Sequence, residues 1–105
     1  LNPLAGDDMP APGEGPSKES RENGNYDVLF CADMPDGTTL KATVTGDMDP
    51  GYGSTSKMIA ESAVCLVKDC GGLEGGIYTP APSMGQKLIS RLIAKAGLTF
   101  SLDSV

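Results

Sequence analysis

Two helix-forming stretches, each entered through a loop rich in glycine and proline, most constrain how this 105-residue chain can fold. The first helix is predicted to begin at the hydroxyl residues 54–56, which can accept free backbone N–H groups, and to end at the glycine pair 71–72. The second is predicted to begin at Ser83, with Gln86 completing a reciprocal capping box, and to end at Gly97. Apolar residues recur at helical spacing in both, namely Ile59, Ala63, Leu66 and Val67, then Met84, Leu88, Ile89, Leu92, Ile93 and Ala96.

Two strand-like stretches precede the helices. Residues 26–33 and 38–45 flank Met34-Pro35-Asp36-Gly37, which is typical of a type I turn, so a β-hairpin is predicted. The second stretch alternates apolar and polar residues, as a strand with one solvated face does. The first is apolar on both faces over its middle and should have something packed on each side. Residues 98–102 alternate too and predict a third strand.

These elements predict an α+β fold for residues 25–105, with a small, mainly antiparallel sheet (the hairpin plus a C-terminal strand) and two helices on one face. So few strands and so modest an apolar content should be marginally stable alone. The sheet face away from the helices is expected to expose apolar surface, around either Val28 and Phe30 or Leu29 and Cys31. A second domain or a second copy of the chain, forming a homodimer, would cover it.

Residues 1–24 are crowded with proline, glycine and charge and offer few apolar side chains to bury. Such a composition does not offset the entropy lost on ordering. This stretch is predicted to be a flexible linker or tail.

The net charge of −6 argues against nucleic acid or an anionic membrane as the main partner. The chain has no histidine, and three scattered thiols do not form a zinc site, so no metal is expected. Cys31, Cys65 and Cys70 are an odd set that does not fit a disulfide framework. On a continuous helix Cys65 and Cys70 would point in different directions. Free thiols fit a reducing compartment, so a cytoplasmic location is expected.

Specific loop motifs carry a resemblance to a known family. Asp49-Pro50-Gly51-Tyr52 leads into the first helix, and Gly75-Gly76, then Tyr78-Thr79-Pro80-Ala81, leads into the second. This pattern resembles the carboxyl-terminal end of the saccharopine dehydrogenase-like oxidoreductases, a family that includes saccharopine reductases and trans-acting enoyl reductases. The match continues upstream through 15–17.

The resemblance implies that the chain is the last part of an NAD- or NADP-dependent oxidoreductase that transfers a hydride. Members of that family open with a nucleotide-binding domain whose glycine-rich loop holds a pyrophosphate at a helix amino terminus. No G-x-G-x-x-G run occurs here, and Asp47 and Asp49 would repel a phosphate near Gly51 and Gly53. We therefore expect no cofactor-binding residues in this chain, and a missing N-terminal nucleotide-binding domain as its partner.

Four residues are candidates for a substrate-pocket wall or a subunit interface: Asp49, Tyr52, Tyr78 and Thr79. Each also has a structural interpretation. Aspartate before Pro-Gly favours a turn and a helix start, tyrosine often packs at a rim, and threonine before proline fixes a loop. A basic stripe on the second helix, at 87, 91 and 95, is either a solvated face or a contact for an acidic surface or a cofactor phosphate. No residue is assigned a catalytic role.

The main alternative is a free-standing, non-enzymatic protein-interaction module that binds through its glycine-rich loops or an apolar face. A small hydrolase built on Asp47 and Asp49 ranks last, because the chain offers neither a nucleophile nor an oxyanion donor for it.

Overall fold

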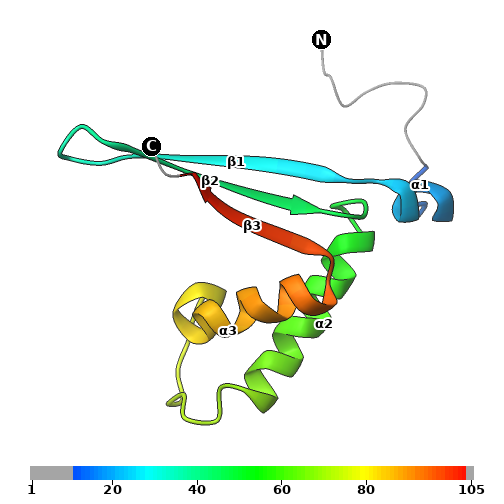
Figure 1. The fold of residues 1–105 in the computed structure, drawn as a ribbon. Helices are drawn as coiled ribbons and strands as arrows, with labels where there is room; N and C mark the ends of the chain where they lie inside the picture. The colour runs from blue at the N-terminus through cyan, green and yellow to red at the C-terminus, as the bar shows by residue number, and fades with distance from the viewer. Residues whose placement is uncertain (1–10, 104–105) are drawn as a thin grey trace.

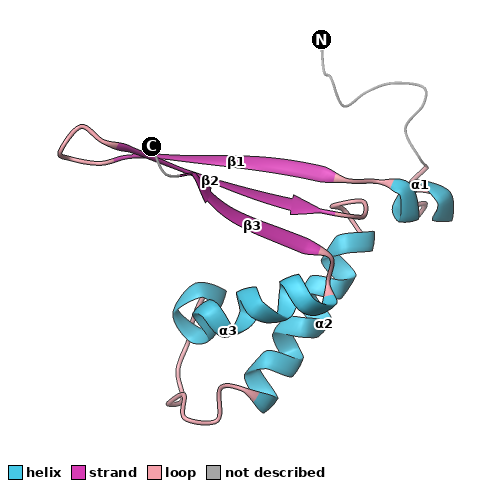
Figure 2. Cartoon of the chain, viewed as in Figure 1, coloured by secondary structure: helices cyan, strands magenta, loops and turns pink. Residues whose placement is uncertain are grey.

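A computed structural model of the chain describes residues 11–103 (Figures 1 and 2). It confirms the α+β fold, with a three-stranded antiparallel sheet and two long helices on one side of it. The elements in chain order are helix α1 (Lys18–Asn23), strands β1 (Tyr26–Asp33) and β2 (Thr39–Gly46), helices α2 (Gly53–Lys68) and α3 (Pro80–Lys95), and strand β3 (Leu98–Asp103).

The central strand of the sheet is β2. Both neighbours, β1 and β3, run antiparallel to it. At the hairpin turn the Gly37 N–H donates to the Met34 carbonyl oxygen at 3.0 Å, which confirms the predicted turn. Val44 lies between Val28 on β1 and Phe100 on β3. Residues paired directly across strands point to the same face, so these three side chains share the face on which the helices lie.

The core forms where the end of the sheet meets the helices. Leu92, Ala96 and Leu98 are buried there, and α3 passes into β3 through Gly97, whose positive φ of 70° ends the helix as predicted. Val44, Phe100, Met58 and Leu88 pack around this cluster. A second buried cluster, Cys65, Cys70 and Met84, joins α2 to α3.

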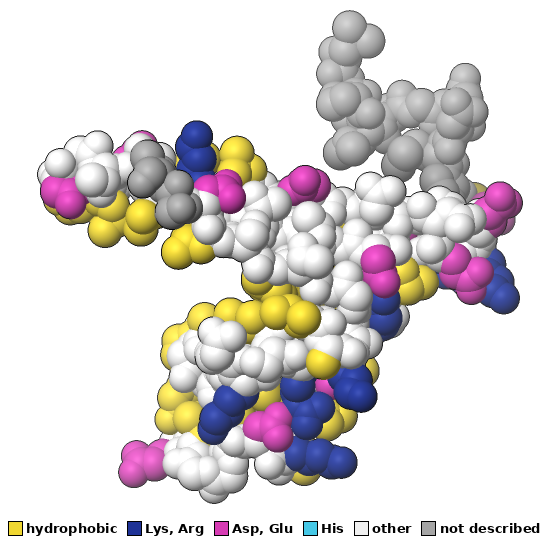
Figure 3. All heavy atoms as spheres, in the orientation of Figure 1, with side chains coloured by type: hydrophobic (Ala, Val, Ile, Leu, Met, Phe, Trp, Pro, Cys, Tyr) yellow, Lys and Arg dark blue, Asp and Glu magenta, His cyan; other side chains and the backbone are white. Residues whose placement is uncertain are grey.

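Beyond this core the sheet extends past the helices as an arm, with apolar side chains along its underside (Figure 3). We define the arm face as the helix-side residues that the core leaves open: Val28, Phe30, Ala32, Leu40, Ala42 and Leu102. Phe30 is 55% exposed and Leu102 is 71% exposed.

The opposite face of the sheet is mostly polar. Leu29 and Cys31 are exposed there, beside threonines such as Thr45 and Thr99, whose hydroxyls are 2.6 Å apart. The side away from the helices therefore does expose apolar residues, as expected, at the second of the two predicted places, Leu29 and Cys31. The helix side is exposed as well, which was not predicted. The reason is that α3 reaches only the start of β3, so the helix side itself stays open along most of β1.

The apolar residues that recur at helical spacing in α2 are largely exposed. Ile59 is 69% exposed and Val67 is 81% exposed, whereas Cys65 is completely buried. The reason is that the neighbouring elements pack against a different side of α2. Cys65 contacts the cluster with Met84 of α3, and Met58 packs against the cluster that contains Leu98 at the start of β3. The helix also ends at Lys68, before the glycine pair.

The starts of both long helices differ from the predicted caps. α2 begins at Gly53, and Ser54 lies inside it, fully buried. α3 begins at Pro80 because proline lacks the N–H that a first turn leaves free and already has a helical φ. Ser83 therefore lies inside the helix, its hydroxyl donating to the Thr79 carbonyl oxygen at 3.0 Å. Gly85, with φ of 48°, is not helical and kinks α3 about one turn after its start at Pro80.

Residues 1–24 are the predicted linker, and the first ten of them lie outside the described residues. Its described part contains α1, a six-residue helix that the sequence pattern did not predict. The Ser17 hydroxyl caps it by accepting from the Ser20 N–H at 3.1 Å. The backbone N–H of Asp49 donates to the Arg21 carbonyl oxygen at 3.1 Å, which ties α1 to the loop before α2.

Candidate functional site

The loop that leads into α2 is organised around the Asp49 carboxylate. Its oxygens accept the backbone N–H groups of Tyr52 at 2.7 Å, Gly53 at 3.0 Å and Gly51 at 3.2 Å. The N–H groups of Tyr52 and Gly53 lie at the start of α2, where a helix leaves such groups without partners, and that of Gly51 belongs to the loop before it. Asp49 thus takes the capping role that the sequence pattern assigned to the hydroxyl residues, and its negative charge also suits the positive end of the helix dipole.

These hydrogen bonds hold the pKa of Asp49 below its ordinary value, with the Gly53 and Tyr52 N–H groups as the main causes. A carboxylate whose pKa is lowered by folding stabilises the folded state above its unfolded pKa. The stabilisation disappears as the pH falls through the lower, folded value.

We therefore expect Asp49→Ala to lower the melting temperature at pH 7, and this deficit to shrink as the pH falls below about 4. Thermal unfolding followed by circular dichroism between pH 7 and pH 2 measures it. Asp27→Ala, which removes an exposed carboxylate from β1, is the control and should change the melting temperature little at pH 7. A deficit of constant size down to pH 2 would mean that the charge of Asp49 is not what stabilises the loop.

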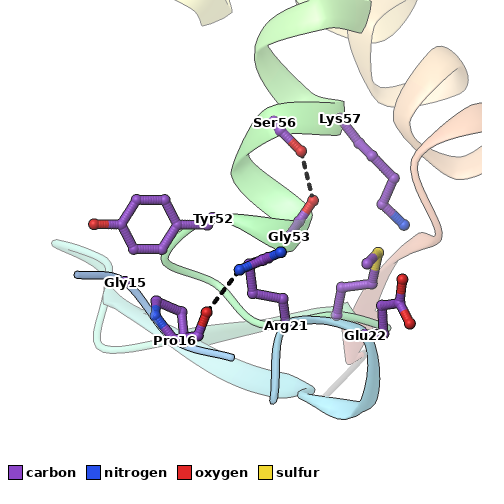
Figure 4. Close-up of a pocket in the computed structure, with 9 residues that line it drawn as sticks. Gly15, Pro16, Arg21, Glu22, Tyr52, Gly53, Ser56 and Lys57 are labelled. Carbon is purple, nitrogen blue, oxygen red and sulfur yellow. Dashed lines mark hydrogen bonds between the residues drawn. The ribbon is translucent and has the colours of Figure 1, made fainter. Parts of the chain in front are cut away.

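A pocket of about 600 Å³ lies beside this loop, between α1 and the first turn of α2 (Figure 4). Tyr52, 60% exposed, lines one side, and Arg21 and Lys57 bring positive charge. Both cations have partners within the chain. The Arg21 guanidinium donates to the Pro16 carbonyl oxygen at 2.6 Å, and the Lys57 ammonium pairs with Asp47 at 2.8 Å. The Ser56 hydroxyl, also in the pocket, donates to the Gly53 carbonyl oxygen.

Two glycines let α1 approach this loop closely. A methyl group at Gly53 would lie 2.7 Å from the Arg21 carbonyl oxygen, and one at Gly24 would lie 2.7 Å from the Asp49 backbone nitrogen. Contacts this short force the backbone to shift. The glycines of the loop motif thus serve close packing between segments.

The other two candidate residues, Tyr78 and Thr79, lie at the opposite end of α2. Sixteen helical residues separate the two places, which corresponds to about 24 Å along the helix axis. The Tyr78 hydroxyl donates to the Glu74 carbonyl oxygen at 3.1 Å within its own loop, and Thr79 is the N-cap residue of α3. The structure therefore brings Asp49 and Tyr52 together, and Tyr78 and Thr79 together, but does not join the two pairs in one pocket.

Two residues of the basic stripe of α3, Arg91 and Lys87, make contacts inside the fold, whereas Lys95 is exposed. Arg91 forms ion pairs with Asp69 and, at 3.0 Å, with Glu61, both from α2 and its carboxyl end. Lys87 donates to the Asp69 carbonyl oxygen at 2.8 Å. Arg91 lowers the pKa of Asp69, and the two carboxylates raise the pKa of Arg91. Sequence reasoning missed this clamp between the helices, although the acidic residues Glu61 on the preceding helix and Asp69 directly after it were a signal for it.

Cys65 and Cys70 lie in the same buried cluster, contrary to the expectation that they point apart. The helix ends between them, at Lys68, so the chain turns back and brings Cys70 against the α2–α3 contact. Burial raises the pKa of the Cys65 thiol. Both are free thiols that act as small core residues.

Two wider features of residues 11–103 bear on function. No group of three or more His, Cys, Asp or Glu side chains in this part of the chain is arranged to hold a metal ion. None of the helices described in it is long and apolar enough to cross a membrane.

Comparison with known proteins finds trans-acting enoyl reductases among the relatives of this chain. The chain is 38% identical over 88 residues to a putative trans-acting enoyl reductase of Mycobacterium tuberculosis, which is 82% of this chain and 21% of that protein. It is 38% identical over 85 residues to the trans-acting enoyl reductase of Mycobacterium ulcerans, and 35% identical over 85 residues to that of Mycobacterium bovis. The chain thus spans about a fifth of the length of these curated relatives. No family model matches it, and no solved structure does.

Proposed function

We propose that this chain is the C-terminal part of an NAD(P)-dependent oxidoreductase of the saccharopine dehydrogenase-like kind, acting on an enoyl group by hydride transfer. The observation that carries the proposal is its 38% identity to trans-acting enoyl reductases over most of this chain but only a fifth of theirs. In this proposal the missing N-terminal domain binds the nucleotide in the cytoplasm, and this part contributes a pocket wall or a subunit interface.

The residues in the described range 11–103 do not fit the nucleotide itself. The α2 amino terminus is the place where Gly-x-Gly precedes a helix, but the Asp49 carboxylate already accepts three of the N–H groups that a phosphate would need. Arg21 and Lys57 are engaged with Pro16 and Asp47. We therefore derive no catalytic step from this chain alone.

The isolated chain should bind neither NADH nor NADPH more tightly than about 100 μM, for two reasons: Asp49 occupies the candidate phosphate position, and the sheet is antiparallel around it. Fluorescence titration of each nucleotide measures this. Asp49→Ala is a matched variant: it frees the helix amino terminus, yet it should still not bind. β2 and α2 flank the loop, but both neighbours of β2 run antiparallel to it, so no parallel dinucleotide-binding unit is formed. Saturable binding by the unmodified chain would contradict this prediction.

The positive test uses the longer relative. The matching fifth of the Mycobacterium ulcerans protein is replaced by this chain, and nucleotide binding and nucleotide-dependent reduction by that chimera are compared with the parent. The proposal expects both to be kept within about tenfold of the parent. A folded chimera that binds nucleotide but reduces nothing would show that this chain does not serve the reductase role.

A free-standing interaction module is the second candidate, and the exposed arm face is the observation that favours it. An apolar face of this kind on a small domain usually marks a contact surface. In that case a folded chimera would lose the reductase activity, while the 105-residue chain would still be stable by itself.

A further inference from the structure

The arm face continues into a groove of about 310 Å³ between the sheet and α3. Ala42, Val44, Phe100 and Leu102 line it from the sheet, and Ile89 and Ile93 line it from the helix. Ile93 is half exposed, although it faces this groove. The apolar underside of the arm and the top of α3 therefore form the two walls of one open wedge (Figures 1 and 3).

The arm face carries no charged side chain. In β1 and β2 the charged residues Asp27, Asp33 and Lys41 alternate with the arm-face residues and so lie on the opposite face of the sheet. A second copy of the same face would meet no like charge there. The net charge of −6 makes two copies repel each other at their charged surfaces. The uncharged arm face is therefore the surface at which this repulsion is weakest.

The exposed apolar area also approaches what a dimer needs. Val28, Phe30, Leu40, Ile93 and Leu102 are exposed by 41% to 71%. Together they present on the order of 500 Å² of apolar surface, which is comparable to the largest patch on a typical monomer, and such patches are often functional. A standard interface buries roughly 800 Å² per partner, so the contact would also have to take in the groove between the sheet and α3.

We propose that two copies of this chain pack their arm faces together, each arm lying over the other and against the groove wall formed by α3. The contact is isologous, because the same patch serves on both copies. Two sheet faces stacked in this way give the aligned packing of a β-sandwich, with the sheets about 10 Å apart. This inference does not depend on the reductase proposal.

The test is the mass of the 105-residue chain in solution, measured by light scattering over a range of concentrations. We expect a dimer. Phe30→Glu places a charge in the contact and should weaken dimerisation by about tenfold or more. Leu29→Glu is the matched control, because Leu29 is the neighbouring residue, is exposed to a similar extent (58% against 55%) and lies on the opposite face. It should leave the dimer intact.

Two further variants complete the test. Leu102→Glu changes the arm face from β3 and should act like Phe30→Glu, while Ile59→Glu changes the exposed stripe of α2 and should not. Circular dichroism verifies that each variant is folded, as expected for exposed positions. A wild-type monomer would overturn the proposal and indicate that another polypeptide covers the arm. Dissociation by Ile59→Glu but not by Phe30→Glu would overturn it as well.

Discussion

Leu92→Ala should lower the free energy of unfolding by about 2–5 kcal/mol, as expected for a buried leucine cut back to alanine. Leu92 is 7% exposed and is packed with Ala96 and Leu98 where α3 turns into the sheet. The cavity would open at the contact that joins the two layers. A domain of this size has a total stability of roughly 5–15 kcal/mol, so the variant should lose a large part of it.

Urea denaturation followed by circular dichroism measures this loss. Val67→Ala is the matched control: it also shortens an apolar side chain on a long helix, but Val67 is 81% exposed. It should change the free energy of unfolding by less than about 0.5 kcal/mol. Equal losses in the two variants would show that α3 does not anchor the core.

Gly46→Ala should destabilise the fold by about 2 kcal/mol or more, the range seen when a packed site is overfilled. A methyl group on Gly46 would overlap the ring of Tyr26, which lies directly opposite on β1. That ring cannot move freely, since the Tyr26 hydroxyl is 2.8 Å from the hydroxyl of Ser54, which is fully buried. The variant would therefore disturb the joint between the sheet and the start of α2.

Gly71→Ala serves as the control, because a methyl group there meets nothing within 4 Å. Thermal unfolding of both variants measures the difference. The double variant Tyr26→Ala/Gly46→Ala tests the cause. If ring overlap is responsible, adding Gly46→Ala to Tyr26→Ala should cost much less than it costs alone. Additive losses would mean that Gly46 is needed for another reason.

The strands and the fold class were predictable because they depend on local patterns. The alternation in 98–102 and the turn at 34–37 set the sheet, and Gly97 marked the end of the last helix correctly. Burial was harder to predict, because it depends on which neighbour arrives. The stripe containing Ile59 has correct helical spacing, yet it remains exposed since α3 packs on another side of α2.

The site was predictable only in its parts. Asp49 and Tyr52 were chosen from a loop motif, and they do share one loop, but nothing local in the sequence shows that Tyr78 lies at the far end of a 16-residue helix from them. The choice of cap at α2 also depended on geometry. A serine at the expected position competes with an aspartate placed so that its carboxylate reaches three N–H groups, and the charged acceptor forms the stronger hydrogen bonds.

The strand order has a consequence for how the molecule assembles. β1 and β2 are joined by a tight turn and can pair at once. β3 also pairs with β2, but both long helices lie between these two strands in the sequence. Closing so long a loop costs entropy that local contacts do not repay. The hairpin should therefore form early, and β3 should join the sheet last. By then the ion pairs of Arg91 with Glu61 and Asp69 hold α3 against α2, and this fixes the direction in which β3 leaves α3.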